Sequence, residues 1–153
     1  MIKIYQRFLS IWFFLGFGIG SGWAQIPGVD QRIQYFVADM EIGLETEVYG
    51  AQIVAESFVA QYYQNRDYQP VWNDLDYAFS VVNIIGDCEL EGLQKEDYHF
   101  SELLALRATL MANRQNAYLV TQFELLLTDA VINYAYHLLN GKVHPENYEF
   151  SWD

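Results

Sequence analysis

The feature that most constrains the fold is an apolar stripe with helical spacing between residues 117 and 140. Its members recur every three or four residues, which places them on one face of a helix: Leu119, Phe123, Leu126, Leu127, Ala130, Tyr134 and Leu138. The other side of this helix is predicted to carry Gln122, Asp129, Asn133 and Tyr136. Gly141 supplies a C-terminal cap, and Pro145 prevents the helix from continuing. At about 1.5 Å per residue the helix is roughly 35 Å long, so it crosses a whole small domain.

Three shorter stripes predict three more helices. The first covers residues 51–65 and carries Ala51, Ala55, Phe58, Val59 and Tyr62. The second ends at Gly86, has Asn73 or Asp74 as its N-cap, and carries Tyr77, Val81, Ile84 and Ile85. The third follows an N-cap at Ser101 and carries Leu103, Leu106 and Leu110. Because no alternating strand pattern of any length is present, the predicted class is mainly α, an irregular helical bundle of about four helices.

The segments between the helices are predicted from weaker signals. Residues 25–47 are expected to be a partly ordered lead-in, in which Ile33, Tyr35, Phe36 and Val37 start a strand or a short helix. Pro70 disfavours helical angles at the preceding residue. We therefore expect Tyr68, Val71 and Trp72 to form an extended aromatic clip that covers an edge of the core.

The first 24 residues have the order of a secretory signal peptide. Lys3 and Arg7 form a positive start, and residues 8–19 are almost free of polar side chains. Cleavage is expected between Ala24 and Gln25. The apolar run is shorter than the ~20 residues that a spanning helix needs, so we expect no membrane anchor after cleavage. The predicted organisation is a signal peptide (1–24), the lead-in (25–47) and one helical domain (48–153), exported across the inner membrane.

The charge of the chain limits its partners. The formal net charge is −12, and without Lys3 and Arg7 the chain keeps six basic and 20 acidic residues, a net charge of −14. Nucleic acids and anionic lipids are polyanions, so neither is expected to be a main partner. Cys88 is the single cysteine and cannot form an internal disulfide. We expect it to be buried rather than reactive.

No cofactor, metal or catalytic residue is predicted from the residue patterns. The three histidines do not have the spacing that places two ligands on one helix face, and are interpreted as exposed or capping: His99, His137 and His144. A calcium loop starting at Asp87 fails because Tyr98 occupies the position of the bidentate glutamate. The paired carboxylates are interpreted as solvated turns and caps: Asp74 and Asp76, Glu89 and Glu91, Glu96 and Asp97.

Three ordered segments nevertheless resemble a known domain. They are Val48-Tyr49-Gly50 followed by residues 62–72, then residues 91–99, then residues 123–130 followed by residues 140–145. Together they resemble the N-terminal scaffold domain of the large Gram-negative murein L,D-transpeptidases, periplasmic enzymes that cross-link peptidoglycan stems. The matching positions are interpreted as structural: Tyr68, Pro70, Trp72, Gly92, Leu93, Tyr98, His99, Thr128, Asp129, Gly141 and Pro145. We expect Thr128 and Asp129 to bond a neighbouring loop.

The resemblance implies a non-catalytic role in cell-wall remodelling. In that family the nucleophile is a cysteine in a Ser-x-Gly-Cys context of a separate C-terminal domain, and Cys88 does not match it. The implied partner is that catalytic domain, with peptidoglycan as a second candidate. The tail carries Tyr148, Phe150 and Trp152 and is expected to pack on another surface. Two alternatives stay open: a stand-alone periplasmic binding module for peptidoglycan or a partner enzyme, and a small glycan hydrolase that uses paired acids.

Overall fold

The computed structural model describes residues 26–44 and 46–142. The predicted signal peptide with its cleavage site Ala24–Gln25, and the tail with His144 and Pro145, lie outside the described residues. The described part is mainly helical, as predicted, and its elements follow in the order α2 (Val29–Glu41), β1 (Glu47–Val48), β2 (Ala51–Gln52), α3 (Glu56–Gln64), α4 (Leu75–Gly86), the 3-10 turns η1 (Cys88–Glu91) and η2 (Lys95–Tyr98), α5 (Phe100–Ala112) and α6 (Ala117–Asn140).

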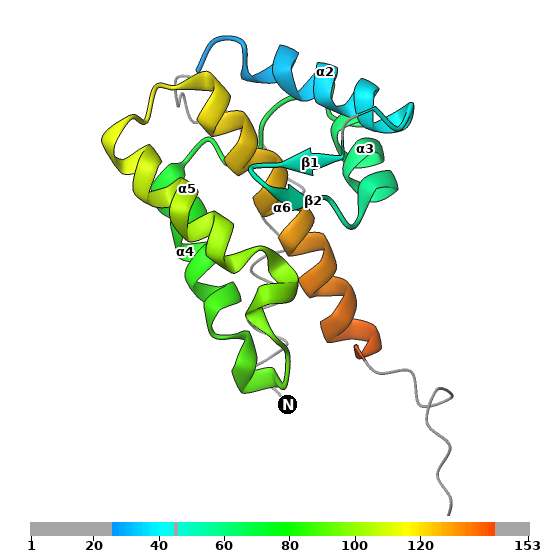
Figure 1. Cartoon of the computed structure of the whole chain (residues 1–153), viewed down its shortest axis with the longest axis vertical. Helices are drawn as coiled ribbons and strands as arrows, with labels where there is room; N and C mark the ends of the chain where they lie inside the picture. Colours follow the sequence, from blue (N-terminus) through cyan, green and yellow to red (C-terminus); the bar gives the residue numbers. More distant parts are fainter. Residues whose placement is uncertain (1–25, 45, 143–153) are drawn as a thin grey trace, which may run out of the picture.

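Helix α6 is the axis of the bundle, and the other helices pack around it (Figure 1). It has the predicted bounds: the Asn116 side chain accepts from the backbone N–H groups of Tyr118 and Leu119, and Gly141 ends the helix with a φ of 76°. Residues 123–131 are all buried, so the helix is surrounded rather than one-sided. Asp129, predicted on the side opposite the apolar stripe, is therefore buried as well. Across the described residues, no helix combines the length and apolar character needed to cross a membrane.

The N-terminal segment is a helix rather than a partly ordered lead-in. Helix α2 packs on α3 and α6, and its buried side chains recur at helical spacing: Val29, Ile33, Phe36, Val37 and Met40. Gly28 starts the helix in the left-handed region, with a φ of 84°. Figure 1 shows α2 crossing one end of the bundle. This burial makes α2 part of the core, which corrects the prediction for this segment.

The chain between α2 and α3 forms a tight hairpin that sequence patterns did not predict. Strands β1 and β2 are antiparallel, with Glu47 opposite Gln52 and Val48 opposite Ala51. Tyr49 and Gly50 both have a positive φ, of 52° and 81°, as a two-residue type I′ turn requires. Ala51 is thus in a strand, and the helix predicted from residue 51 begins five residues later.

The buried face of helix α3 also differs from the predicted one. It buries Val59, Ala60 and Tyr63, whereas Phe58 is 61% exposed. The difference arises because Tyr63 is drawn into a polar cluster on α6, which the hydrophobic pattern alone does not encode.

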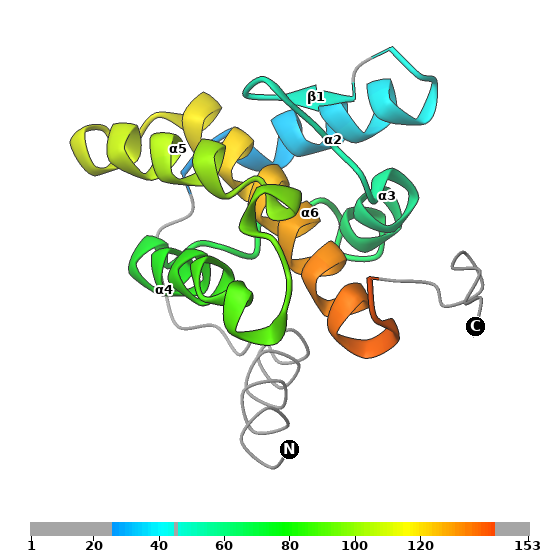
Figure 2. The same cartoon turned by 60° about the horizontal axis from the view of Figure 1, so that its bottom comes forward.

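Helices α4 and α5 pack together along one side of α6, and Figure 2 shows α3 on the other side. Asp74 is the N-cap of α4, as predicted, with its Oδ1 accepting from the N–H groups of Asp76 (3.0 Å) and Tyr77 (3.1 Å). Tyr77, a member of the predicted apolar stripe, is 39% exposed and therefore lies at the edge of the buried face of α4. Helix α5 begins two residues earlier than predicted: His99 takes the cap position with a φ of 56°, and Ser101 is inside the helix.

Candidate functional site

Three polar side chains are buried in the middle of α6. Glu124, Thr128 and Asp129 have exposed fractions of 1%, 4% and 0%. Burying a polar or charged group is costly unless it is hydrogen-bonded, so the partners of these side chains show what they organise.

Glu124 holds the segment that follows Pro70. Its Oε1 accepts from the backbone N–H of Val71 at 2.5 Å, and its Oε2 accepts from the backbone N–H of Trp72 at 3.0 Å. The Tyr63 hydroxyl donates to the same Oε1 at 2.9 Å. One carboxylate therefore joins α6 to α3 and to the loop between α3 and α4.

Thr128 completes a closed ring of hydrogen bonds with Glu124. The Trp72 Nε1–H donates to Thr128 Oγ1 at 3.0 Å, and the Thr128 and Tyr63 hydroxyls are 2.7 Å apart. Because Tyr63 donates to the carboxylate, the Thr128 hydroxyl must be the donor to Tyr63. Each donor of the ring then has an acceptor. The Trp72 indole donates to Thr128, Thr128 donates to Tyr63, Tyr63 donates to Glu124, and the Trp72 backbone N–H also donates to Glu124. We call these four residues the α6 ring.

Burial and hydrogen bonding act in opposite directions on the charge of this ring. Burial raises the pKa of Glu124 to about 7, although the N–H groups of Val71 and Trp72, the Tyr63 hydroxyl and the charge of Arg66 all lower it. The pKa of Tyr63 is well above its ordinary value, because of burial and then because of the nearby Glu124 carboxylate. Tyr63 therefore stays protonated and remains a donor.

Asp129 organises a second cluster one residue further along α6. Its carboxylate accepts from the backbone N–H groups of Val54 (3.2 Å) and Ala55 (2.7 Å), just before α3. His99 Nε2 is 2.7 Å from Oδ2, and Asn133 Nδ2 donates to the same oxygen at 3.1 Å. Helix α3 has no side-chain cap of its own, so Asp129 supplies one from across the bundle and places a negative charge near the α3 N-terminus. The expectation that Thr128 and Asp129 bond neighbouring loops is confirmed.

A smaller polar cluster lies near the end of α6. The Tyr98 hydroxyl is 3.0 Å from His137 Nδ1, and the Tyr134 hydroxyl donates to the Glu91 carboxylate. The Tyr98 and Tyr134 rings are edge to face, with centroids 5.3 Å apart. Burial, followed by the charge of Lys142, lowers the pKa of His137. This cluster fixes η2 against α6.

The remaining predicted structural positions have separate roles. Gly92 ends η1 in the left-handed region with a φ of 78°, and Leu93 after it is buried. Trp72 is buried, but Tyr68 has a φ of 59°, so the aromatic clip is not extended throughout. Of the two interpretations given for His99, exposed or capping, the second holds: it is buried at 8% exposure and occupies the N-cap position of α5. Sequence reasoning assigned no role to Glu124, although a lone acid between Phe123 and Leu125 was a usable signal.

Cys88 has the surroundings of an unreactive thiol. Cys88 is fully buried, and burial followed by the charges of Glu89, Glu91 and Glu96 raises the pKa of its thiol. A thiol in such surroundings is a poor nucleophile. Within residues 26–44 and 46–142, no group of three or more histidine, cysteine or acidic side chains is placed to hold a metal ion.

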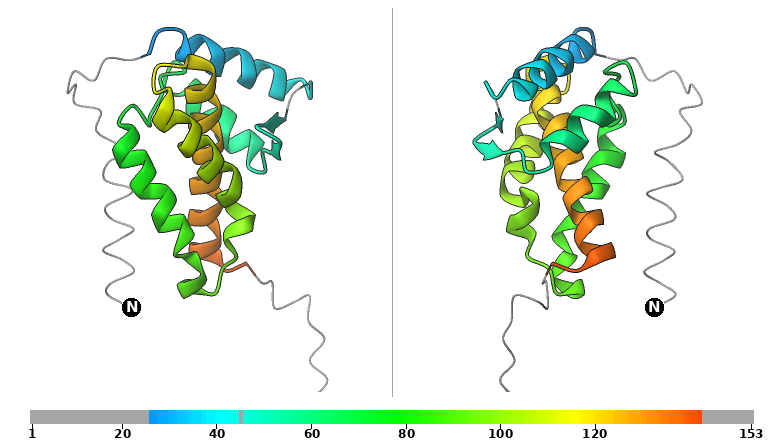
Figure 3. Two further views of the ribbon diagram at one scale, coloured as in Figure 1. Left: turned by 60° about the vertical axis from the view of Figure 1, so that its left-hand side comes forward. Right: turned by 90° about the vertical axis from the view of Figure 1, so that its right-hand side faces the viewer.

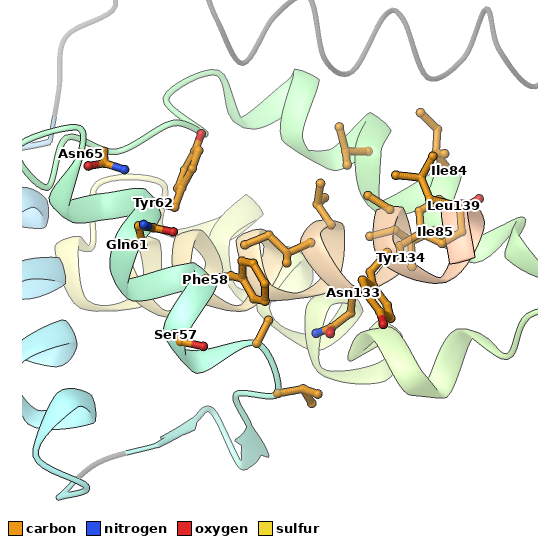
Figure 4. A pocket seen from close by; sticks show the side chains of 17 residues that line it. Ser57, Phe58, Gln61, Tyr62, Asn65, Ile84, Ile85, Asn133, Tyr134 and Leu139 are labelled. Atoms are coloured by element: carbon orange, nitrogen blue, oxygen red, sulfur yellow. The ribbon is translucent and has the colours of Figure 1, made fainter. Parts of the chain in front are cut away.

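An apolar groove of about 830 Å³ lies between α3, α4 and the second half of α6. Figure 3 (right) shows these three helices in another view, and Figure 4 shows the side chains that line the groove. None of the lining residues is charged, and four of the large apolar ones are exposed: Val54, Phe58, Tyr136 and Leu139.

The buried carboxylates bond backbone groups and side chains of the domain itself, so they act as internal clasps of a helical domain. A family model described as Scaffold domain matches residues 57–153, and the chain belongs to this family. The match confirms the scaffold-domain resemblance drawn from the sequence. No curated protein and no solved structure gave a match.

Proposed function

We propose that this chain is the scaffold domain of a periplasmic murein L,D-transpeptidase and acts in peptidoglycan cross-linking and cell-wall remodelling. The observation that carries the proposal is the match to the Scaffold domain family over residues 57–153. The three ordered segments that resemble the transpeptidase scaffold, and the signal peptide expected before residue 25, support the finer assignment.

The clasps explain how such a domain would work. Glu124 and Asp129 fix two loops and the start of α3 to one rigid helix, so the outer surface keeps a defined shape. A partner catalytic domain held on that surface would have a fixed orientation, which is the contribution of a scaffold to a reaction that it does not itself perform.

The first experiment tests location and partner together. The full chain with a C-terminal tag is expressed in a Gram-negative host and cross-linked in cells, and the captured proteins are identified by mass spectrometry. We expect processing after Ala24, recovery in the periplasmic fraction, and capture of a protein with a Ser-x-Gly-Cys domain. A matched Ala24→Arg variant should remain unprocessed. Cytoplasmic recovery of the wild-type chain would contradict the proposal.

The second experiment tests the absence of chemistry. The purified chain is incubated with stem peptides, and cross-linked products are measured with wild-type protein and with Cys88→Ala. We expect no product from either. Product formation that is lost in Cys88→Ala would refute the scaffold assignment.

The alternative is a stand-alone binding module for peptidoglycan or a partner enzyme, and the apolar groove is the observation that favours it. Sedimentation with purified murein sacculi separates the two proposals. Retention of the chain alone, reduced by Phe58→Asp, would favour the binding module.

A further inference from the structure

We propose that residues 143–153 of this chain dock in the apolar groove between α3, α4 and α6, and that the tail is the natural occupant of this groove. The inference goes beyond the scaffold function and does not depend on it. It rests on the position of the groove, its chemistry and the sequence that follows α6.

The groove begins where α6 ends. Tyr136 and Leu139 line it, and Gly141 follows only two residues after Leu139. Gly141 has a φ of 76° and a ψ of 154°, a combination that is essentially restricted to glycine. This conformation takes the chain sharply off the helix axis, at the end of the groove rather than at a distant surface.

The tail has the length and pattern that the groove requires. An extended segment of 11 residues spans at most about 36 Å. The part of α6 that lines the groove, Val131 to Leu139, rises only about 12 Å. Tyr148, Phe150 and Trp152 occur at every second position, so they share one side of an extended segment. The groove offers uncharged apolar walls to that side.

Charge favours the same occupant. The lining residues carry no charge although the chain has a net charge of −12, so the acidic residues of the tail meet no like charge on the groove floor. Figure 4 places Tyr62 and Leu139 at opposite ends of the groove. At the Tyr62 end, the Arg66 guanidinium lies 5.6 Å from the Tyr62 ring centroid, which places a positive charge beside this end of the uncharged groove. The acidic residues of the tail are compatible with that charge.

The test measures amide hydrogen exchange of residues 143–153 in the full chain by mass spectrometry. In wild-type protein we expect exchange slower by about tenfold or more than in the free peptide of the same sequence, the factor that a docking free energy near 1.4 kcal/mol gives. Phe58→Asp places a charge in the groove at an exposed position, and should return exchange to the free-peptide rate. Leu44→Asp, a substitution at a residue 74% exposed and outside the groove, is the matched control and should retain protection.

Circular dichroism must show that both variants are folded with the wild-type unfolding midpoint. If Phe58→Asp does not fold, Leu139→Asp provides the second groove variant. Free-peptide exchange in the wild-type tail would overturn the proposal, as would protection that is equal in all folded variants. Protection that disappears on dilution, together with a dimer in light scattering, would assign the groove to a second copy and would also overturn it.

Discussion

Replacing Glu124 with glutamine tests the electrostatics of the α6 ring, because the two side chains have the same shape. In the wild-type protein, Oε1 accepts from Val71 and Tyr63, and Oε2 accepts from Trp72. A glutamine can keep the bonds to its oxygen, but its NH₂ group then faces the Trp72 N–H, and neither donor has a partner. The protonated wild-type carboxyl also places a donor, its O–H, among these groups, so it is the neutral counterpart of glutamine, whereas the ionised carboxylate accepts from all three donors.

The net effect depends on pH, with a sign that follows from the raised pKa of Glu124. The carboxyl releases its proton near pH 4.5 in the unfolded chain and near about 7 in the folded one. Between these values the folded state holds a proton that the unfolded state has lost, so the free energy of unfolding falls as the pH rises. The difference between the two pKa values corresponds to about 3 kcal/mol, lost between pH 4.5 and 7. Glutamine undergoes no such loss.

We therefore expect Glu124→Gln to be about as stable as wild type at pH 5, where the folded wild-type protein also holds a neutral side chain at this position, and more stable than wild type by about 2–3 kcal/mol at pH 8. The assay is urea unfolding followed by circular dichroism at pH 5, 6, 7 and 8. Glu47→Gln changes an exposed glutamate in the same way and should show no such trend. A cost that increases with pH would refute the reasoning, because it would mean that the donors around Glu124 lower its pKa more than burial raises it.

Three further substitutions or measurements test the other buried groups. Thr128→Val leaves the Trp72 Nε1–H without its acceptor and removes the donor to the Tyr63 hydroxyl, and should destabilise by about 1–3 kcal/mol in urea unfolding. Thr128→Ser keeps the hydroxyl and should cost less; equal costs would contradict the ring. Asp129→Ala removes the carboxylate that contacts His99 and accepts from the backbone N–H groups just before α3. The variant should lose about 3–5 kcal/mol of unfolding free energy. A loss below about 1 kcal/mol would contradict the role of Asp129 as a clasp. Cys88 should react with a thiol reagent at pH 8 only after unfolding, because burial raises the pKa of its thiol; stoichiometric labelling of folded protein would contradict this.

Local signals in the sequence located most helix ends. Asp74 caps α4 and Gly86 ends it, as predicted, because a cap uses only neighbouring residues along the chain. The same holds for α6, whose break before residue 117 and glycine at 141 are short-range features. The start of helix α3 could not be predicted from local signals in this way. The apolar pattern placed it at residue 51, but the positive φ angles of Tyr49 and Gly50 form a hairpin turn that puts residue 51 in a strand.

The candidate site was only partly predictable. Thr128 and Asp129 were predicted to bond a loop, and they do, but the sequence could not say which loop or that Asp129 is fully buried. Glu124 and Tyr63 were missed because their partners are 52 to 65 residues away in the chain. A prediction from the hydrophobic pattern assumes that a helix has one buried face. It cannot assign the polar residues of α6, which is buried on all sides between residues 123 and 131.

The sequence by itself determined the helical class, the long central helix and the cap residues, since these depend on interactions over three or four positions. It also carried the resemblance that the family match bears out. Only the tertiary structure decided that α2 joins the core, which side of α3 faces inward, and that two carboxylates of α6 hold distant backbone segments. The physical reason is that a buried polar group is stable only beside its partner, and that partner is brought near by packing rather than by sequence position.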